Sequence, residues 1–364
     1  MTIRDLTDQL ESLAPLSLQE KYDNAGLLVG EPSMNVEAAL ICLDVTEAVL
    51  EEAVSLGCNL IISHHPVIFN GIKRLTAQNE TQRCVMKAIR NDIAIYAAHT
   101  NLDNVARGVN GKIAERLDLT DCRILSPVSD SLSKLVTFVP KLLVQKVREA
   151  MFAAGAGTLG NYDSCSFNAE GYGSFRAGEY AQPFVGEKHT IHYEPEIKVE
   201  VIVPRYKLPN VVAALKAAHP YEEPAYDCIP LLNKWEQTGA GIVGNLKNET
   251  RLEDFLHHLK SVFNVPSIRY THPVKPCVRR IAVCGGSGSF LIQDAIRANA
   301  DVFITADVKY HEFMEADRQM VIVDAGHYET EQYTKELMYE IISKKFPTFA
   351  LHISKVTTNP ILYL

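Results

Sequence analysis

Two adjacent histidines, His64 and His65, end an apolar run and precede Pro66 in the stretch IISHHPVIF. Successive side chains on a strand point to opposite faces, and a residue before proline favours extended backbone, so the pair is expected on a loop just past a strand end. There, each imidazole could bind one of two metal ions about 3.5 to 4 Å apart. For this pair alone, surface or hydrogen-bonded histidines are the simpler interpretation.

Two later loops change that interpretation. HTNLD contains Asp103 and, four residues earlier, His99, and a carboxylate beside imidazoles suits a divalent first-row metal, although the loop alone could be an Asx-capped turn. In GHYETE, His327 and Glu331 are four residues apart at the start of the last predicted helix, so both project from one face. Gly326 lets the chain turn into that helix. Glu331 could bridge two ions, and an exposed first-turn pair is the alternative.

These loops together supply nitrogen and oxygen ligands without a thiolate. Such a set favours zinc, manganese, iron or cobalt over a closed structural zinc site. Two divalent ions are therefore the predicted cofactor, with open coordination positions for a water whose pKa falls toward neutrality. The candidate ligands are His64, His65, Asp103, His327 and Glu331.

Other polar loops are weaker candidates. GGSGS, residues 285–289, follows a strand and opens a helix, so its amides could cradle a phosphate, but it matches neither a P-loop nor G-x-G-x-x-G, and a plain tight turn is the alternative. Asp307, Lys309 and His311 lie in ITADVKYHE. Asp307 and His311, like His99, are candidates for supporting a ligand or contacting substrate, and a solvated loop is the alternative.

The elements that must position these loops alternate between strand and helix in both outer thirds. The first third gives strands at AALICLDV, NLIIS and IAIYAAH, with helices at TEAVLEEAVSLG and TQRCVMKAIRND. The last third gives strands at RRIAVCGG, DVFITAD and MVIVDAG, a helix at SFLIQDAIRANA and one long amphipathic helix at HYETEQYTKELMYEIISKK. This alternation predicts two related α/β halves whose loops face one another at the carboxyl ends of parallel strands.

The middle of the chain contains an internal repeat. LVTFVPK is matched by VEVIVPR, and equal offsets lead from Pro140 to Ala153, Ala154 and Tyr162 and from Pro204 to Ala217, Ala218 and Tyr226. Two copies of strand, proline, helix and strand make a βαββαβ, ferredoxin-like unit, although two ordinary βαβ segments could match by chance. The predicted organisation is one metal-binding α/β domain formed by residues 1–125 and 236–364, interrupted by an inserted domain at residues 126–235.

The composition is that of an ordinary globular protein. The chain has 364 residues, 47% hydrophobic and 22% charged, and no apolar run approaches the roughly 20 residues needed to span a bilayer. The N-terminus lacks the layout of a secretory signal, so a cytoplasmic protein is expected. A net charge of −8 gives no overall attraction to nucleic acid, although a local basic patch could exist. Eight cysteines without a C-x-x-C pair predict buried thiols in a reducing compartment.

Six motifs, in this order, resemble the Nif-three-like family, whose bacterial members are named GTP cyclohydrolase 1 type 2 homologues. They are DNAGLLVG, SHHP, HTNLD, GGSGS, TADVKYHE and DAGHYETE, and the middle resembles a PII-like or CutA-like insert. The resemblance implies a dinuclear site with ligands at the five positions named above, Glu331 being shared, and a toroidal homohexamer with sites facing an internal cavity. Ala306 stands where glycine is expected in that loop and narrows the backbone approach to the site.

The family name suggests hydrolytic opening of the GTP imidazole ring with release of formate, but a shared fold does not fix the substrate. The predicted function is a metal-dependent hydrolase acting on a nucleotide or related small molecule, with His99, Asp307 and His311 as unranked proton carriers. One alternative is a non-catalytic metal-binding assembly whose insert senses a ligand or gates the cavity. Another is a ring-shaped scaffold for single-stranded nucleic acid or a protein partner.

Overall fold

The computed structural model describes the whole chain, Met1–Leu364, and confirms the predicted mixed α/β class. The chain packs into two compact units. The first, called here the outer unit, contains Met1–Ser126 and Gln237–Leu364, and the second, the middle unit, contains Pro127–Glu236. All eight cysteines are free thiols. No helix combines the length and the apolar character that a bilayer span requires.

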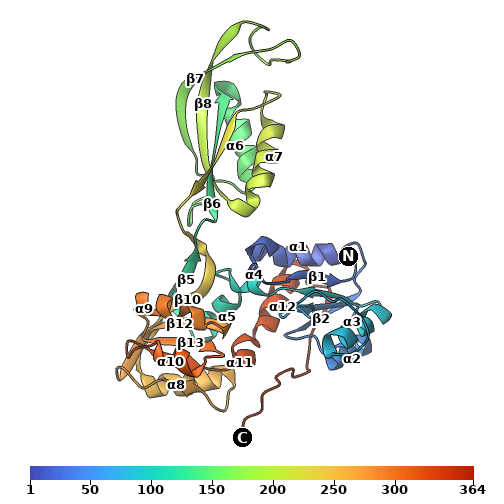
Figure 1. Cartoon of the computed structure of the whole chain (residues 1–364), viewed down its shortest axis with the longest axis vertical. Helices are drawn as coiled ribbons and strands as arrows, with labels where there is room; N and C mark the ends of the chain where they lie inside the picture. Colours follow the sequence, from blue (N-terminus) through green and yellow to red (C-terminus); the bar gives the residue numbers. More distant parts are fainter. The chain divides into compact units, whose positions relative to one another are not determined.

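The first sheet of the outer unit has the order β1-β4-β3-β2-β15, and Figure 1 labels its strands β1 and β2. Its strands are β1 (Gly26–Val29), β2 (Ala38–Cys42), β3 (Leu60–Ser63), β4 (Ala94–Ala97) and β15 (Ala350–Ile353). All pairs are parallel except β1 with β4. Every residue of β2, β3 and β4 is buried, which explains their continuous apolar runs, because a parallel sheet is covered on both faces.

The second sheet has the order β11-β14-β13-β12-β10-β5. Its strands are β5 (Thr120–Val128), β10 (Trp235–Arg251), β11 (Arg269–Tyr270), β12 (Cys277–Ser287), β13 (Val302–Ala306) and β14 (Val321–Asp324). The three consecutive strands β12, β13 and β14 are parallel, as β2, β3 and β4 are in the first sheet. The order β14-β13-β12 thus repeats β4-β3-β2, so the loops after β3 and β13 correspond, as do those after β4 and β14.

The helices of the outer unit flank these sheets. They are α1 (Ile3–Leu13), α2 (Glu47–Ser55), α3 (Glu80–Arg90), α4 (Thr100–Asp103), α5 (Val109–Arg116), α8 (Leu252–Phe263), α9 (Ile292–Arg297), α10 (Tyr310–Met314), α11 (His327–Glu331) and α12 (Thr334–Lys345), with short 3₁₀ turns at Leu16–Leu18 and Ser289–Leu291. The first turns of α2 and α3 are capped by Thr46 and Asn79, whose side chains accept from the backbone amides of Val49 and Gln82.

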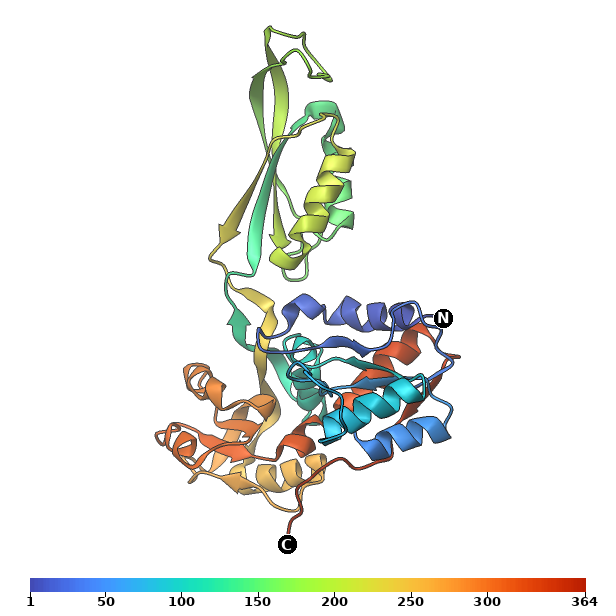
Figure 2. The same cartoon turned by 45° about the vertical axis from the view of Figure 1, so that its right-hand side comes forward.

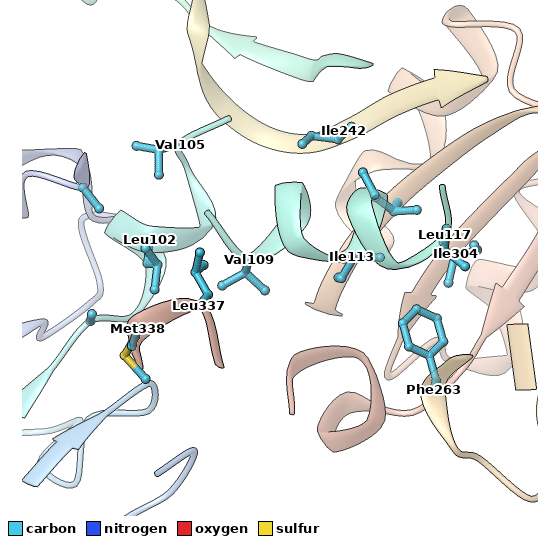
Figure 3. Packing of buried hydrophobic residues seen from close by; sticks show 14 of the residues in the cluster. Leu102, Val105, Val109, Ile113, Leu117, Ile242, Phe263, Ile304, Leu337 and Met338 are labelled. Atoms are coloured by element: carbon cyan, nitrogen blue, oxygen red, sulfur yellow. The ribbon is translucent and has the colours of Figure 1, made fainter. Parts of the chain in front are cut away.

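One buried hydrophobic cluster contains residues from both sheets of the outer unit. Figure 3 shows Val109 and Ile113 of α5 in this cluster, with Leu337 of α12 and Ile304 of β13. Because close-packed interiors transmit strain and do not deform freely, this shared core fixes the strand ends of one sheet relative to those of the other. The polar loops at those ends therefore have defined positions.

The last predicted helix is broken, contrary to the expectation of one long helix. It forms α11 and then α12, with a turn at Gln332 and Tyr333. The Gln332 side chain donates to the Phe263 carbonyl at 2.9 Å, and the Tyr333 hydroxyl donates to the Val262 carbonyl. These hydrogen bonds stabilise the turn between the two helices. The orientation of α11, which carries Glu331, is therefore not set by the helix axis of α12.

The middle unit has the order β7-β8-β6-β9, and its elements run βαββαβ along the chain. They are β6 (Leu132–Pro140), α6 (Val144–Ala153), β7 (Phe167–Arg176), β8 (Ile191–Pro204), α7 (Leu208–Ala218) and β9 (Tyr226–Leu231), with 3₁₀ turns at Lys141–Leu143 and Arg205–Lys207. The repeat matches through proline and helix, but Tyr162 lies in a turn before β7 whereas Tyr226 begins β9. The glycine-rich link after α6 delays the strand.

Candidate metal centre

His64 and His65 follow β3 directly, at the carboxyl end of the first sheet. Their ring centroids lie 4.9 Å apart. The Nδ1 atom of His64 is 2.8 Å from the Ala98 carbonyl oxygen, an acceptor that only a protonated nitrogen can pair with. Its Nε2 atom is fully buried and has no hydrogen-bond partner. The fold thus holds a buried nitrogen lone pair at the strand end without satisfying it.

Each of the other three histidines at these strand ends pairs its Nδ1 atom with a carboxylate. Such pairing fixes the tautomer and the ring orientation of a metal-ligating histidine, and it leaves Nε2 as the ligand atom. The pairs are His65 with Asp44 at 2.7 Å, His99 with Asp23 at 2.7 Å and His327 with Asp307 at 2.6 Å.

Glu331 lies at the point where these Nε2 atoms converge. Its Oε2 atom is 2.9 Å from His65 Nε2 and 3.0 Å from His327 Nε2, yet it makes no hydrogen bond. Its Oε1 atom is 3.8 Å from His64 Nε2, and Asp103 Oδ1 is 3.7 Å from the same nitrogen. Nitrogen and oxygen ligand atoms gathered this closely around a buried carboxylate fit a cation held among them.

The pKa shifts at the centre follow from the same contacts. Burial lowers the pKa of His65 and His327, but contacts with carboxylates, including Glu331, outweigh it and raise their pKa values to about 10 and about 9. For Glu331, burial opposes ionisation, yet the three histidines hold its pKa well below its usual range. Burial and the charge of Glu331 raise the pKa of Asp103, although a quarter of its side chain is exposed. The site therefore attracts positive charge.

Two groups of side chains have ligand atoms that all lie within 4.8 Å of one another. They are His64, His65 and His99, and His65, His327 and Glu331. The residue types and spacing of either group can bind a metal ion. Asp103 belongs to neither group, although it lies beside His64.

The remaining predicted residues take different positions. Asp307, at the carboxyl end of β13, holds His327, and His99 lies among the histidines of the first sheet. His311 lies exposed on α10, where its ring contacts Tyr310, and it does not reach the centre. Ala306 is fully buried at the end of β13.

Sequence reasoning did not assign Asp44 and Asp23. Asp44 follows β2, the parallel neighbour of β3, and Asp23 precedes β1, the neighbour of β4. Burial raises the pKa of Asp23, but His99 and Thr100 hydrogen bonds outweigh it and lower that pKa to about 2. Asp44 could have been recognised as a partner of His65 from its position at the end of the neighbouring strand. That recognition requires the strand order, which the sequence alone does not state.

Three of the five backbone amides in the GGSGS turn are already hydrogen-bonded within the protein. The backbone N–H groups of Gly285, Gly286 and Gly288 donate to Asn110, Thr330 and Thr305 at 2.9, 3.0 and 2.9 Å. A phosphate cradle needs unpaired amides, so the alternative of a structural turn fits better. Gly286 has a φ of +60°, and a Cβ there would lie 2.1 Å from Glu331 Oε1. The glycine allows the backbone to approach the centre closely.

We expect Asp44→Asn to weaken metal binding by about 10- to 100-fold, because loss of the carboxylate frees the His65 ring and its tautomer. Isothermal titration calorimetry with zinc measures this change. Asp8→Asn, at an exposed position of α1, is the matched control and should bind like the wild type. Equal affinities for Asp44→Asn and wild type would contradict the orienting role of Asp44.

A cavity of about 440 Å³ opens onto the centre. Its wall includes the aromatic side chains Tyr22, Phe69 and Phe290 together with polar residues of the centre, namely His65, His99, Asp103, His327 and Glu331. Cavities of roughly 300 to 1,000 Å³ suit small organic ligands. The arrangement therefore places flat apolar surface next to the candidate metal ligands.

Known proteins match this chain in sequence and in structure over nearly its whole length. A GTP cyclohydrolase 1 type 2 homolog from Halalkalibacterium halodurans is 40% identical over 359 residues, covering 97% of this chain and 96% of its own. The crystal structure of a Bacillus cereus protein related to NIF3 matches with 36% identity and a TM-score of 0.85, covering 100% and 99% of the two chains. A Staphylococcus aureus structure matches with 31% identity and a TM-score of 0.76 over the same shares. The family model for Duf34/NIF3 (NGG1p interacting factor 3) matches residues 1–360, and the chain belongs to this family.

Proposed function

We propose that the chain is a dinuclear, divalent-metal-dependent hydrolase acting on a nucleotide or a related small molecule. The observation that carries the proposal is the convergence of three histidine Nε2 atoms on Glu331 without a hydrogen bond to its Oε2 atom. His65 belongs to both candidate groups, which together contain four of the five predicted ligands, and the fifth, Asp103, lies beside His64. Bound ions of this kind would supply a water of lowered pKa and Lewis acidity toward a substrate oxygen.

The surrounding residues support binding and proton transfer. Tyr22 and Phe69, whose ring centroids lie 6.3 Å apart, offer a surface on which a planar base can stack. Asp23 accepts a hydrogen bond from His99 Nδ1, so Nε2 is the ring nitrogen of this cavity-lining residue that is left to bind a metal ion or to accept a proton. This contact favours His99 over the exposed His311 as the proton carrier. The name of the relatives adds GTP to the substrates to be tried first.

The test compares one preparation in two states. Metal is removed with a chelator and restored with zinc, manganese, iron or cobalt, and each state is assayed for metal content and for turnover of a nucleotide panel that includes GTP. Turnover that disappears and returns with metal supports the hydrolase. Tight metal retention without turnover of any substrate would refute it and favour a regulatory assembly, and salt-sensitive binding of oligonucleotides would favour a scaffold.

We also propose a homohexamer, which rests on the family resemblance. Multi-angle light scattering should then give six times the chain mass of 40.5 kDa. A monomer or dimer at micromolar concentration would contradict it.

We expect deletion of residues 126–235, with a short glycine-serine linker in their place, to leave metal stoichiometry and affinity unchanged. The reason is that every candidate ligand and every carboxylate that supports one lies in the outer unit. Metal analysis and calorimetry of the purified deletion variant measure this. Loss of metal from a variant whose circular dichroism shows a folded α/β protein would show that the proposed domain boundary is wrong.

A further inference from the structure

A second cavity, of about 580 Å³, lies within the middle unit. It is formed around β7 and β8 and is closed by side chains from the segments that follow β7 and α7. None of the proposed metal ligands lines it. The cavity therefore belongs to a different site.

The strand register places this cavity on the sheet face opposite the two helices. Val199, Val201 and Val203 of β8 pack in the cluster formed with α6 and α7, which lie against one face (Figure 1). Side chains alternate along a strand, so Glu196 and Lys198 project from the other face. Figure 2 shows no helix of the middle unit covering that face.

Two glycines of β7 make the hollow. Gly171 pairs in register with Glu196, and a Cβ at Gly171 would meet no atom within 4 Å. A Cβ at Gly173 would lie 2.2 Å from Glu196 Oε2, so only glycine leaves room for the carboxylate. Glycine within a strand weakens it and often marks close approach of a ligand. The missing side chains leave space directly beside Glu196.

Glu196 is a buried carboxylate without a cationic partner. The residue is 9% exposed, and its Oε1 atom accepts a hydrogen bond from the Tyr221 hydroxyl at 2.9 Å. No basic side chain forms an ion pair with it, because the nearby Lys198 Nζ atom pairs with Glu200 at 2.6 Å. Buried glutamates are rare unless paired, since burying an unpaired charge is costly. The negative charge of Glu196 thus has no positive counter-charge from the protein in this cavity.

Aromatic rings surround the same space. The ring centroid of Tyr221 lies 6.2 Å from that of Phe175 and 6.3 Å from that of Phe184. Ring faces attract ammonium and guanidinium groups, and Glu222 and Glu223 add negative charge to the wall. These features disfavour an anionic ligand. They also disfavour a metal ion, which would require a cluster of ligand atoms that the cavity does not contain.

We infer that this cavity binds a small organic cation whose ammonium or guanidinium group pairs with Glu196 and lies against Phe175, Phe184 and Tyr221. The inference is independent of the proposed hydrolase activity. The middle unit would then bind its own ligand, and the buried carboxylate and the three aromatic rings would select for an organic cation.

The experiment is isothermal titration calorimetry of the full-length protein with agmatine, cadaverine and choline, and with inorganic phosphate as an anionic probe. We expect saturable binding of at least one cation and none of phosphate. Tightest binding of agmatine would identify a guanidinium ligand, of cadaverine a primary ammonium, and of choline a quaternary ammonium. Failure of all three cations to bind at millimolar concentration, or binding of phosphate in their place, would overturn the inference.

Two variants test the location. Glu196→Gln keeps the side-chain shape but removes the charge, and Gly171→Leu fills the open space; each should weaken cation binding at least about tenfold. Glu149→Gln, exposed on α6, and Gly71→Leu, in the outer unit where a Cβ also meets no atom within 4 Å, are the matched controls and should bind like the wild type. Unchanged binding in both test variants, with wild-type melting temperatures, would place the ligand elsewhere and overturn the inference.

Discussion

Replacing Glu331 with glutamine is expected to abolish tight binding of divalent metal. Three histidine Nε2 atoms lie within 4 Å of its carboxylate, which is itself buried. The amide has nearly the same shape but no charge, so a cation at this point would lose its main counter-charge. Residues that only orient a ligand typically change metal affinity 10- to 100-fold, so loss of this side chain should exceed about 100-fold.

Metal content after purification and calorimetric titration with zinc both measure this effect. Glu315→Gln, exposed after α10, removes the same charge away from the centre and should retain wild-type affinity. A second readout is thermal stability, because a ligand at 100 times its Kd adds about 2.7 kcal/mol to the folded state. Zinc should therefore raise the melting temperature of the wild type and of the control but not of Glu331→Gln. Wild-type stoichiometry and affinity in Glu331→Gln would contradict the proposed centre.

Gly286→Ala is expected to remove most metal affinity without altering any proposed ligand. The new Cβ would lie 2.1 Å from Glu331 Oε1 and 3.2 Å from His327 Nε2, so the carboxylate must move. The backbone at this position, with φ of +60°, also disfavours a side chain by about 1 to 2 kcal/mol. We expect affinity to fall at least about 100-fold, as for loss of the ligand itself.

Gly71→Ala provides the control, since a Cβ there meets no atom within 4 Å. It should match the wild type in zinc affinity and differ little in melting temperature. Both variants can be compared by calorimetry and by thermal unfolding with and without metal. If Gly286→Ala bound zinc as tightly as Gly71→Ala, the close approach of the turn to Glu331 would have no functional meaning.

The parts of the centre that local patterns encode could be predicted from the sequence. His64 and His65 could be placed at a strand end by the apolar run and Pro66, and the spacing of His327 and Glu331 put both on one helical turn. The prediction that these four residues lie together depended on the two outer thirds being related α/β halves. The repeated strand order of the two sheets supports that relationship.

The parts that depend on contacts between distant segments could not be predicted. Asp44 supports His65 because β2 lies beside β3, an adjacency that no local pattern states. The break between α11 and α12 is held by Gln332 and Tyr333, which bond to the end of α8. The strands β10 and β15 also went unassigned, because β10 crosses from one unit to the other and β15 is short and partly exposed. Each depends on tertiary partners and has no periodicity of its own.

The strand β15 has a consequence for biosynthesis. It pairs with β2 although about 300 residues separate the two strands, so the first sheet lacks one edge until β15 has been synthesised. Glu331 also emerges from the ribosome long after His64 and His65, although all three meet in one place. Nascent chains usually fold domain by domain as they emerge, and here the middle unit can do so first. A cation that needs both the histidines and Glu331 would therefore load only after the second half of the outer unit has been synthesised, and a product truncated before Glu331 would carry the histidines without this carboxylate.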